Sequence, residues 1–79
     1  MGLPKGEEEW AEHARLFLKE ELRKADVTYV ELAKRLKRYG FKETEASITN
    51  KLKRGTFTAM FFLAALRAIG VEEVRLEDV

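Results

Sequence analysis

Apolar residues recur every three or four positions through most of the chain, and glycines interrupt this pattern at positions 40, 55 and 70. That spacing places apolar side chains on one stripe of an α-helix. A glycine directly after such a segment is typical of a helix C-terminus, because glycine adopts the left-handed conformation without a side-chain clash. The pattern predicts a single all-α domain over residues 1–79. Its helices are expected at about 7–24, 28–39, 44–54 and 58–69, followed by a tail at 71–79.

The first predicted helix has an apolar stripe and oppositely charged ends. The stripe consists of Trp10, Ala14, Phe17, Leu18, Leu22 and Ala25. Acidic residues at 7–9 begin the helix, and Arg23 and Lys24 end it. Both groups complement the helix dipole, which is positive at the N-terminus and negative at the C-terminus.

The second predicted helix opens at Thr28. Its hydroxyl is expected to accept from the amide of Glu31 while the Glu31 carboxylate reaches back, which makes a capping box. Val27 and Leu32 occupy the positions of a hydrophobic staple. The expected buried side consists of Val30, Leu32, Ala33 and Leu36, and the pattern does not decide whether Tyr39 joins them. The expected outward side consists of Lys34, Arg35, Lys37 and Arg38.

The third predicted helix has a narrow apolar side, formed by Ile48 and Leu52 one turn apart, with Ala46 expected to be partly covered. Thr44 is expected to cap its start. Because the apolar side is narrow, most of the surface of this helix is free to face solvent or a partner. The outward face is expected to present Thr44, Ser47, Asn50, Lys51 and Arg54, at spacings that share one side of a helix.

The fourth predicted helix begins at a Thr58 cap, with Phe57 and Phe62 as its staple, and is apolar almost all round. Arg67 is its only charge. We expect it to be the central helix against which the other three pack, with any excess apolar face forming a dimer contact. The tail is expected to be either a short strand or a final helical turn, and a strand would pair with the same segment of a second chain.

Composition narrows the class of protein. The chain has 79 residues and no cysteine, which excludes disulfides, thiolate zinc sites and a cysteine nucleophile. It has no apolar run of membrane-spanning length, and acidic residues stand where a signal peptide needs apolar ones. We therefore expect a cytoplasmic protein with no membrane partner. Charged residues make up 37%, glutamine is absent and Asn50 is the only asparagine, a composition that resembles heat-adapted proteins.

The positive charge is concentrated in the middle of the chain. Residues 27–55 hold 8 basic and 3 acidic groups, whereas residues 1–26 hold 5 and 7 and residues 56–79 hold 2 and 4. Such a field favours a polyanionic partner. A solvated helix face explains the charge equally well, so both interpretations stay open at this point.

Particular residues follow the order of a known type of domain. They are Leu32, Ala33 and Leu36 in the second helix, Ile48, Leu52 and Gly55 in the third, and Leu63, Leu66, Ile69, Gly70 and Val71 in the fourth. This pattern resembles the phage-repressor-like, or lambda-repressor-like, helix-turn-helix domains, and the resemblance implies a compact four-helix DNA-binding fold. The chain departs from that type between Leu36 and Gly55, where it has several extra residues. Either the second helix is longer, or the turn at 39–43 is enlarged.

A second resemblance points the same way. It is carried by Thr28 and Tyr29, residues 43–45, Asn50 and Lys51, Arg54 and Gly55, Phe57 and residues 68–70. These residues are similar to a bacterial family of small helix-turn-helix-like domains of unknown function. That family implies the fold and leaves the biochemical role open.

In a helix-turn-helix domain, the second helix of the motif enters the major groove, and basic groups around it hold phosphates. Asn50 can pair with adenine, and Arg54 can fork onto guanine or hold a phosphate. The candidate DNA-binding residues are Thr44, Ser47, Asn50, Lys51, Lys53, Arg54, Arg38 and Lys42, with Lys34 and Lys37 as further phosphate contacts. Most of these also suit helix caps and dipoles. Asn50 stands out, because asparagine is a poor helix former and the chain otherwise avoids amides.

No catalytic, metal or cofactor site is expected. His13, the only histidine, has no converging ligands in sequence, and Ser47, the only serine, has no base to activate it. We therefore expect a small transcriptional regulator that binds double-stranded DNA, with RNA as an alternative ligand. It is expected to be a homodimer through the fourth helix or the tail. The rival hypothesis is a protein-interaction module that keeps the helical fold and uses the apolar surface around Met60, Phe61 and Phe62 to hold a partner or a second copy.

Overall fold

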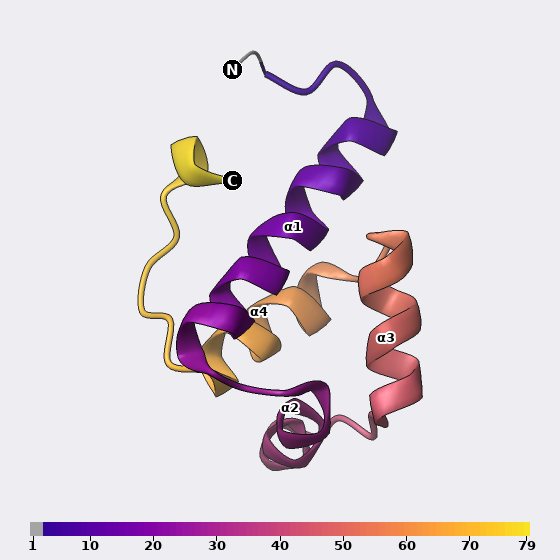
Figure 1. The fold of residues 1–79 in the computed structure, drawn as a ribbon, viewed down its shortest axis with the longest axis vertical. Helices are drawn as coiled ribbons and strands as arrows, with labels where there is room; N and C mark the ends of the chain where they lie inside the picture. Colours follow the sequence, from indigo (N-terminus) through magenta and orange to yellow (C-terminus); the bar gives the residue numbers. More distant parts are fainter. Residues whose placement is uncertain (1–2) are drawn as a thin grey trace.

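The computed structural model describes residues 3–79, which form four α-helices and two short 3₁₀ helices (Figure 1). The elements are α1 (Glu7–Ala25), α2 (Tyr29–Leu36), η1 (Lys37–Tyr39), α3 (Glu45–Arg54), α4 (Ala59–Ala68) and η2 (Leu76–Asp78). No strand occurs within this part of the chain. The prediction of an all-α, four-helix fold is confirmed. None of the described helices is long and apolar enough to cross a membrane.

The helices pack so that α1 and α2 each contact both α3 and α4. In Figure 1, the long α1 crosses in front of α4, α3 stands to one side, and α2 lies near the end of α1. Every α-helix contributes to the core, and its largest fully buried side chains are Phe61, Leu18, Leu32, Leu36, Ile48 and Leu52. Each contributes roughly 1.5–3 kcal/mol by leaving water, so together they hold α3 firmly against α1 and α2.

Threonines cap three of the four helices, as predicted. The hydroxyls of Thr28, Thr44 and Thr58 accept from backbone amides three residues ahead, at 3.1, 3.1 and 3.0 Å. The predicted capping box at Thr28 is only half formed. The Glu31 carboxylate accepts instead from Arg35 Nε, at 3.2 Å, because an arginine one turn ahead offers a charged donor.

The helix ends also follow the glycines, with one exception. Gly40, Gly55 and Gly70 all have positive φ, as the C-terminal caps require. Gly55 is further constrained, because a Cβ atom there would lie 2.6 Å from the carbonyl oxygen of Ala11 in α1. The first helix ends instead at Asp26, a non-glycine residue with φ of 58°, and no glycine signalled that end.

Some residues assigned to apolar stripes are exposed. Val30 and Tyr39 are each 45% exposed and Trp10 is 50% exposed, while Ala25 and Ala46 also face solvent. The buried side of α2 is narrower than predicted, since only Leu32, Ala33 and Leu36 are buried in it. The buried residues of α1, Leu18 and Leu22, lie in its second half, which leaves Trp10 near its start open.

The expectation that the fourth helix is central is wrong. Only α1 and α2 pack substantially against it among the helices of residues 3–79, whereas α3 packs against α1 and α2 instead. Phe61, Ala65 and Leu66 are buried in the core, so Phe61 does not belong to the apolar surface that the rival hypothesis placed around Met60, Phe61 and Phe62. Met60 and Leu63 are 68% and 65% exposed, and Phe62 is partly buried. The helix therefore presents an apolar outer face, because its sequence is apolar on more sides than the fold covers.

The connection between α2 and α3 accommodates the extra residues in two ways. The tighter helix η1 prolongs α2 by one turn, and an extended stretch follows Gly40 up to Thr44. Phe41 from this stretch packs edge-on against Phe61, with ring centroids 6.5 Å apart. The enlarged turn is thus anchored in the core.

The tail runs back along the molecule in extended conformation and ends in η2 (Figure 1). Val71 and Val74 pack against the core. The sequence left open whether the tail is a strand or a helical turn. In the structure it is an extended stretch that ends in a short 3₁₀ turn.

Candidate nucleic-acid interface

The outward side of α3 is a continuous exposed face. Ile48 and Leu52 point into the core, with 0% and 1% of their surface exposed. The residues on the opposite side, all exposed, are Ala46, Thr49, Asn50, Lys53 and Arg54. We call these five residues the α3 face. The inward orientation of Ile48 and Leu52 that the sequence predicted is confirmed.

The polar groups of the α3 face remain largely free for a ligand. Within residues 3–79, the side chains of Asn50, Lys53 and Arg54 make no hydrogen bond or ion pair. Only Thr49 is engaged, since its hydroxyl donates to the carbonyl oxygen of Glu45 at 2.8 Å. Asn50 lies three and four residues from Lys53 and Arg54, which makes the three side chains neighbours on the helix surface. An amide flanked by two cations can read a base edge and hold phosphates.

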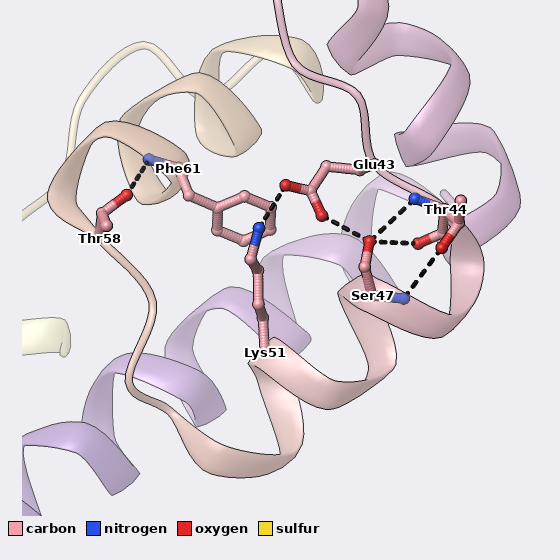
Figure 2. A network of polar contacts seen from close by, with 6 residues as sticks. All are labelled: Glu43, Thr44, Ser47, Lys51, Thr58 and Phe61. Carbon is pink, nitrogen blue, oxygen red and sulfur yellow. Dashed lines mark hydrogen bonds and ion pairs between the residues drawn. The ribbon is translucent and has the colours of Figure 1, made fainter.

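A polar network occupies the edge of α3 that faces α4 (Figure 2). The Glu43 side chain is 7% exposed and accepts from the Ser47 hydroxyl, at 2.6 Å, and from the Lys51 ammonium group. The Ser47 hydroxyl also accepts from the Thr44 amide at 2.9 Å, which completes a capping box. The Lys51 ammonium group lies 4.8 Å from the ring centroid of Phe61 in α4. The network ties the start of α3 to the core.

This network changes the predicted site. Thr44, Ser47 and Lys51 were placed on one outward face with Asn50 and Arg54, but their polar groups are used within the protein. The sequence-based interpretation missed Glu43, whose carboxylate attracts both Ser47 and Lys51. Helical spacing could not have indicated this, because Glu43 lies in the extended stretch before the Thr44 cap and reaches Ser47 and Lys51 only through the fold of the turn.

Further basic residues lie beyond the α3 face. Lys34 and Arg38 line a groove of about 450 Å³ between α2, η1 and the end of α4, and no residue of α3 contributes to it. Lys37 and Lys42 line a second hollow at the turn that leads into α3. All four are exposed. Lys42 is therefore close to the start of α3, whereas Arg38 belongs to a different flank of the molecule.

At its other edge, α3 borders a groove of about 340 Å³ that involves three helices. It is lined by Arg15 and Lys19 of α1, Tyr29 of α2, and Thr49, Leu52 and Lys53 of α3. Burial raises the pKa of the Tyr29 phenol above its usual value. Lys19 was not among the predicted site residues, because its position beside α3 arises only from the packing of α1.

One protein family matches the chain. The family model described as Domain of unknown function (DUF6471) matches residues 10–74, a span that runs from the first turn of α1 to beyond the end of α4. No curated protein and no solved structure matches the chain significantly.

Proposed function

The chain belongs to the family described as Domain of unknown function (DUF6471), and we propose that it is a helix-turn-helix DNA-binding protein, a small transcriptional regulator. In this proposal, α2 and α3 form the motif, and the α3 face enters the major groove. The observation that carries the proposal is the α3 face itself. Its amide and cations are exposed and unpaired within residues 3–79, on a helix whose other side is fixed in the core.

The distribution of ion pairs supports a polyanionic ligand. Most cations of α1 are neutralised by acidic neighbours three residues away, as in the pairs of Arg15 with Glu12 and Arg23 with Glu20. In the basic middle of the chain, only Arg35 and Lys51 have acidic partners among the described residues. The basic residues without one are Lys34, Lys37, Arg38, Lys42, Lys53 and Arg54. Unneutralised charge of this kind attracts the phosphate backbone.

The order of the helices supports the same proposal. A capped α2, a turn and then an exposed α3 resemble the motif of phage-repressor-like domains, and the residues that suggested that likeness include Leu32, Leu36, Ile48 and Leu52. All four are buried and fix α3 beside α2. The enlarged turn, anchored by Phe41, leaves the α3 face unobstructed by the connection.

The residues of the α3 face take distinct roles in this proposal. Asn50, at the centre of the face, makes paired hydrogen bonds with the edge of an adenine. Arg54 donates two hydrogen bonds to a guanine or to a phosphate. Ala46 has only a methyl group, which lets the helix approach the bases closely. Lys42 holds a phosphate near the start of α3, while Arg38, on another flank, contributes to the long-range field.

The proposal is tested by selecting preferred sites from random duplexes and measuring affinity for variants. Arg54→Ala is expected to weaken binding to the selected site about tenfold. Asn50→Ala is expected to relax the preference for adenine at one position more than it lowers overall affinity. Arg67→Ala, which removes an exposed cation from α4, is the matched control and should bind as the unmodified protein does. Equal affinity in all variants would overturn the assignment of α3, and preference for RNA over duplex would change the ligand.

A second function is favoured by the exposed apolar side chains of α4. Met60 and Leu63 lie in adjacent turns, and both are more than half exposed. Such a face suits a protein partner or a second copy of the chain, and dimers are the usual form of helix-turn-helix regulators. If α4 joins two copies, Leu63→Lys should convert dimers into monomers in analytical ultracentrifugation. A monomer in the unmodified protein at high concentration would count against this face as the dimer contact.

A further inference from the structure

The groove between α1, α2 and α3 concentrates positive charge without an acidic side chain in its lining. Lys19 and Lys53 come from different helices, and neither has an acidic partner within residues 3–79. Arg15 also lines the groove, although its guanidinium is paired with Glu12 at 2.7 Å. Bringing like charges together is unfavourable unless an anion joins them. The groove therefore has the electrostatics of an anion site.

Tyr29 adds a neutral hydrogen-bond donor to this lining. It is half-buried, and the burial raises the pKa of its phenol, so the hydroxyl stays protonated at neutral pH. The Thr49 hydroxyl, in contrast, is already used on the carbonyl oxygen of Glu45. An oxyanion in the groove would thus meet two ammonium groups and one phenol.

The position of the groove decides which anion is expected there. Lys53 belongs both to the groove and to the α3 face, and it follows Asn50 by three residues. Residues with this spacing are neighbours on the helix surface. An anion held by Lys53 therefore lies beside whatever Asn50 contacts.

We propose that this groove seats a single backbone phosphate of the bound nucleic acid, held between Lys19 and Lys53 and contacted by Tyr29. The inference rests on the proposed DNA-binding function and extends it to α1, which is outside the helix-turn-helix motif. It assigns Lys19 the role of a phosphate-binding residue. Because one phosphate is shared by two lysines, the two side chains act as a unit.

The test is the salt dependence of duplex affinity for Lys19→Ala, Lys53→Ala and the double variant. The slope of log affinity against log salt counts the phosphates that are neutralised, at about 0.9 for each. Each single variant is expected to bind roughly three- to tenfold more weakly, equally for different sequences. The double variant should lose about 0.9 of slope in total, because only one phosphate is released. Lys19→Arg, which keeps the charge, should restore most of the affinity.

Other outcomes would overturn the proposal that Lys19 and Lys53 bind the same phosphate. A loss of about 1.8 in the double variant means that the lysines hold two separate phosphates. Unchanged affinity in Lys19→Ala, with normal binding by the unmodified protein, removes α1 from the interface and leaves the proposed function standing. Absence of salt-dependent duplex binding by the unmodified protein defeats both proposals. Arg67→Ala again serves as the control, and thermal melts of each variant show that the fold is kept.

Discussion

Lys51 illustrates how one buried carboxylate redirects the side chains around it. Its ammonium group pairs with the Glu43 carboxylate and lies over the Phe61 ring. The Lys51 side chain therefore stabilises the packing of α3 and is not free to contact a ligand. Lys53, two residues later, has no acidic partner within residues 3–79 and remains exposed. Two lysines with the same chemistry thus have different roles, and a substitution separates them.

We predict that Lys51→Met lowers the free energy of unfolding by about 1–3 kcal/mol, because Glu43 keeps a buried carboxylate that has lost its charged partner. Lys53→Met, the matched control, should change it by less than about 0.5 kcal/mol. Urea denaturation followed by circular dichroism measures both. Equal stability of the two variants would show that the network in Figure 2 contributes nothing to α3.

Gly55 is a second residue where the fold depends on a single atom. We predict that Gly55→Ala lowers the free energy of unfolding by more than about 2 kcal/mol, since it combines positive φ with a Cβ atom 2.6 Å from the Ala11 carbonyl oxygen. Gly40→Ala is the control, because Gly40 has φ of 85° and no atom within 4 Å of its Cβ position. It should cost only about 1 kcal/mol. A thermal melt of the pair that shows the same loss in both would contradict the close contact between α1 and α3.

At the scale of the element, local signals in the sequence were sufficient to predict where the helices lie. Thr28, Thr44 and Thr58 mark three starts, and glycines mark most ends, because both act through contacts within a few residues. The signals failed where distant packing decides. Neither the exposure of Val30 and Leu63 nor the placement of Lys19 beside Lys53 follows from periodicity, which gives the faces of a helix but not which face is covered.

Periodicity also explains which residues of the candidate site were predicted correctly and which were not. Ile48 and Leu52 were correctly placed inside, because two apolar residues one turn apart define the buried side of α3. Asn50 and Arg54 were found on the exposed side for the same reason. Ser47 and Lys51 lie near the boundary between the two sides, where a neighbour such as Glu43 decides their direction.

The threonine caps allow a prediction for a whole helix. Thr58→Ala should lower the free energy of unfolding by about 1 kcal/mol, because it removes the acceptor for the Phe61 amide at the start of α4. Thr56→Ala lies in the same connection and caps no helix, so it should have little effect. Denaturant midpoints of the two variants make the comparison. A larger loss in Thr56→Ala would mean that α4 starts by another contact.

At the scale of the whole molecule, the charge is divided between segments of the chain. The segment that holds α2, the turn and α3 is basic, whereas the segments that hold α1 and the tail are acidic on balance, and the net charge of the chain is only +1. In the proposed complex, this distribution favours contact through the α3 face, because a polyanion repels the acidic segments. The exposed apolar side chains of α4 belong to a different helix from the α3 face, so the proposed dimer contact and the proposed nucleic-acid contact use different helices.

We propose that the α3 face binds a nucleic acid through exposed groups that have no ion-pair partner within residues 3–79. The most direct measurement is a salt titration of duplex binding by the unmodified protein and by the double variant Asn50→Ala, Arg54→Ala. We predict affinity that falls steeply with salt, and a variant that binds all sequences weakly and alike. Salt-independent binding, or a variant that keeps the sequence preference of the unmodified protein, would contradict the claim.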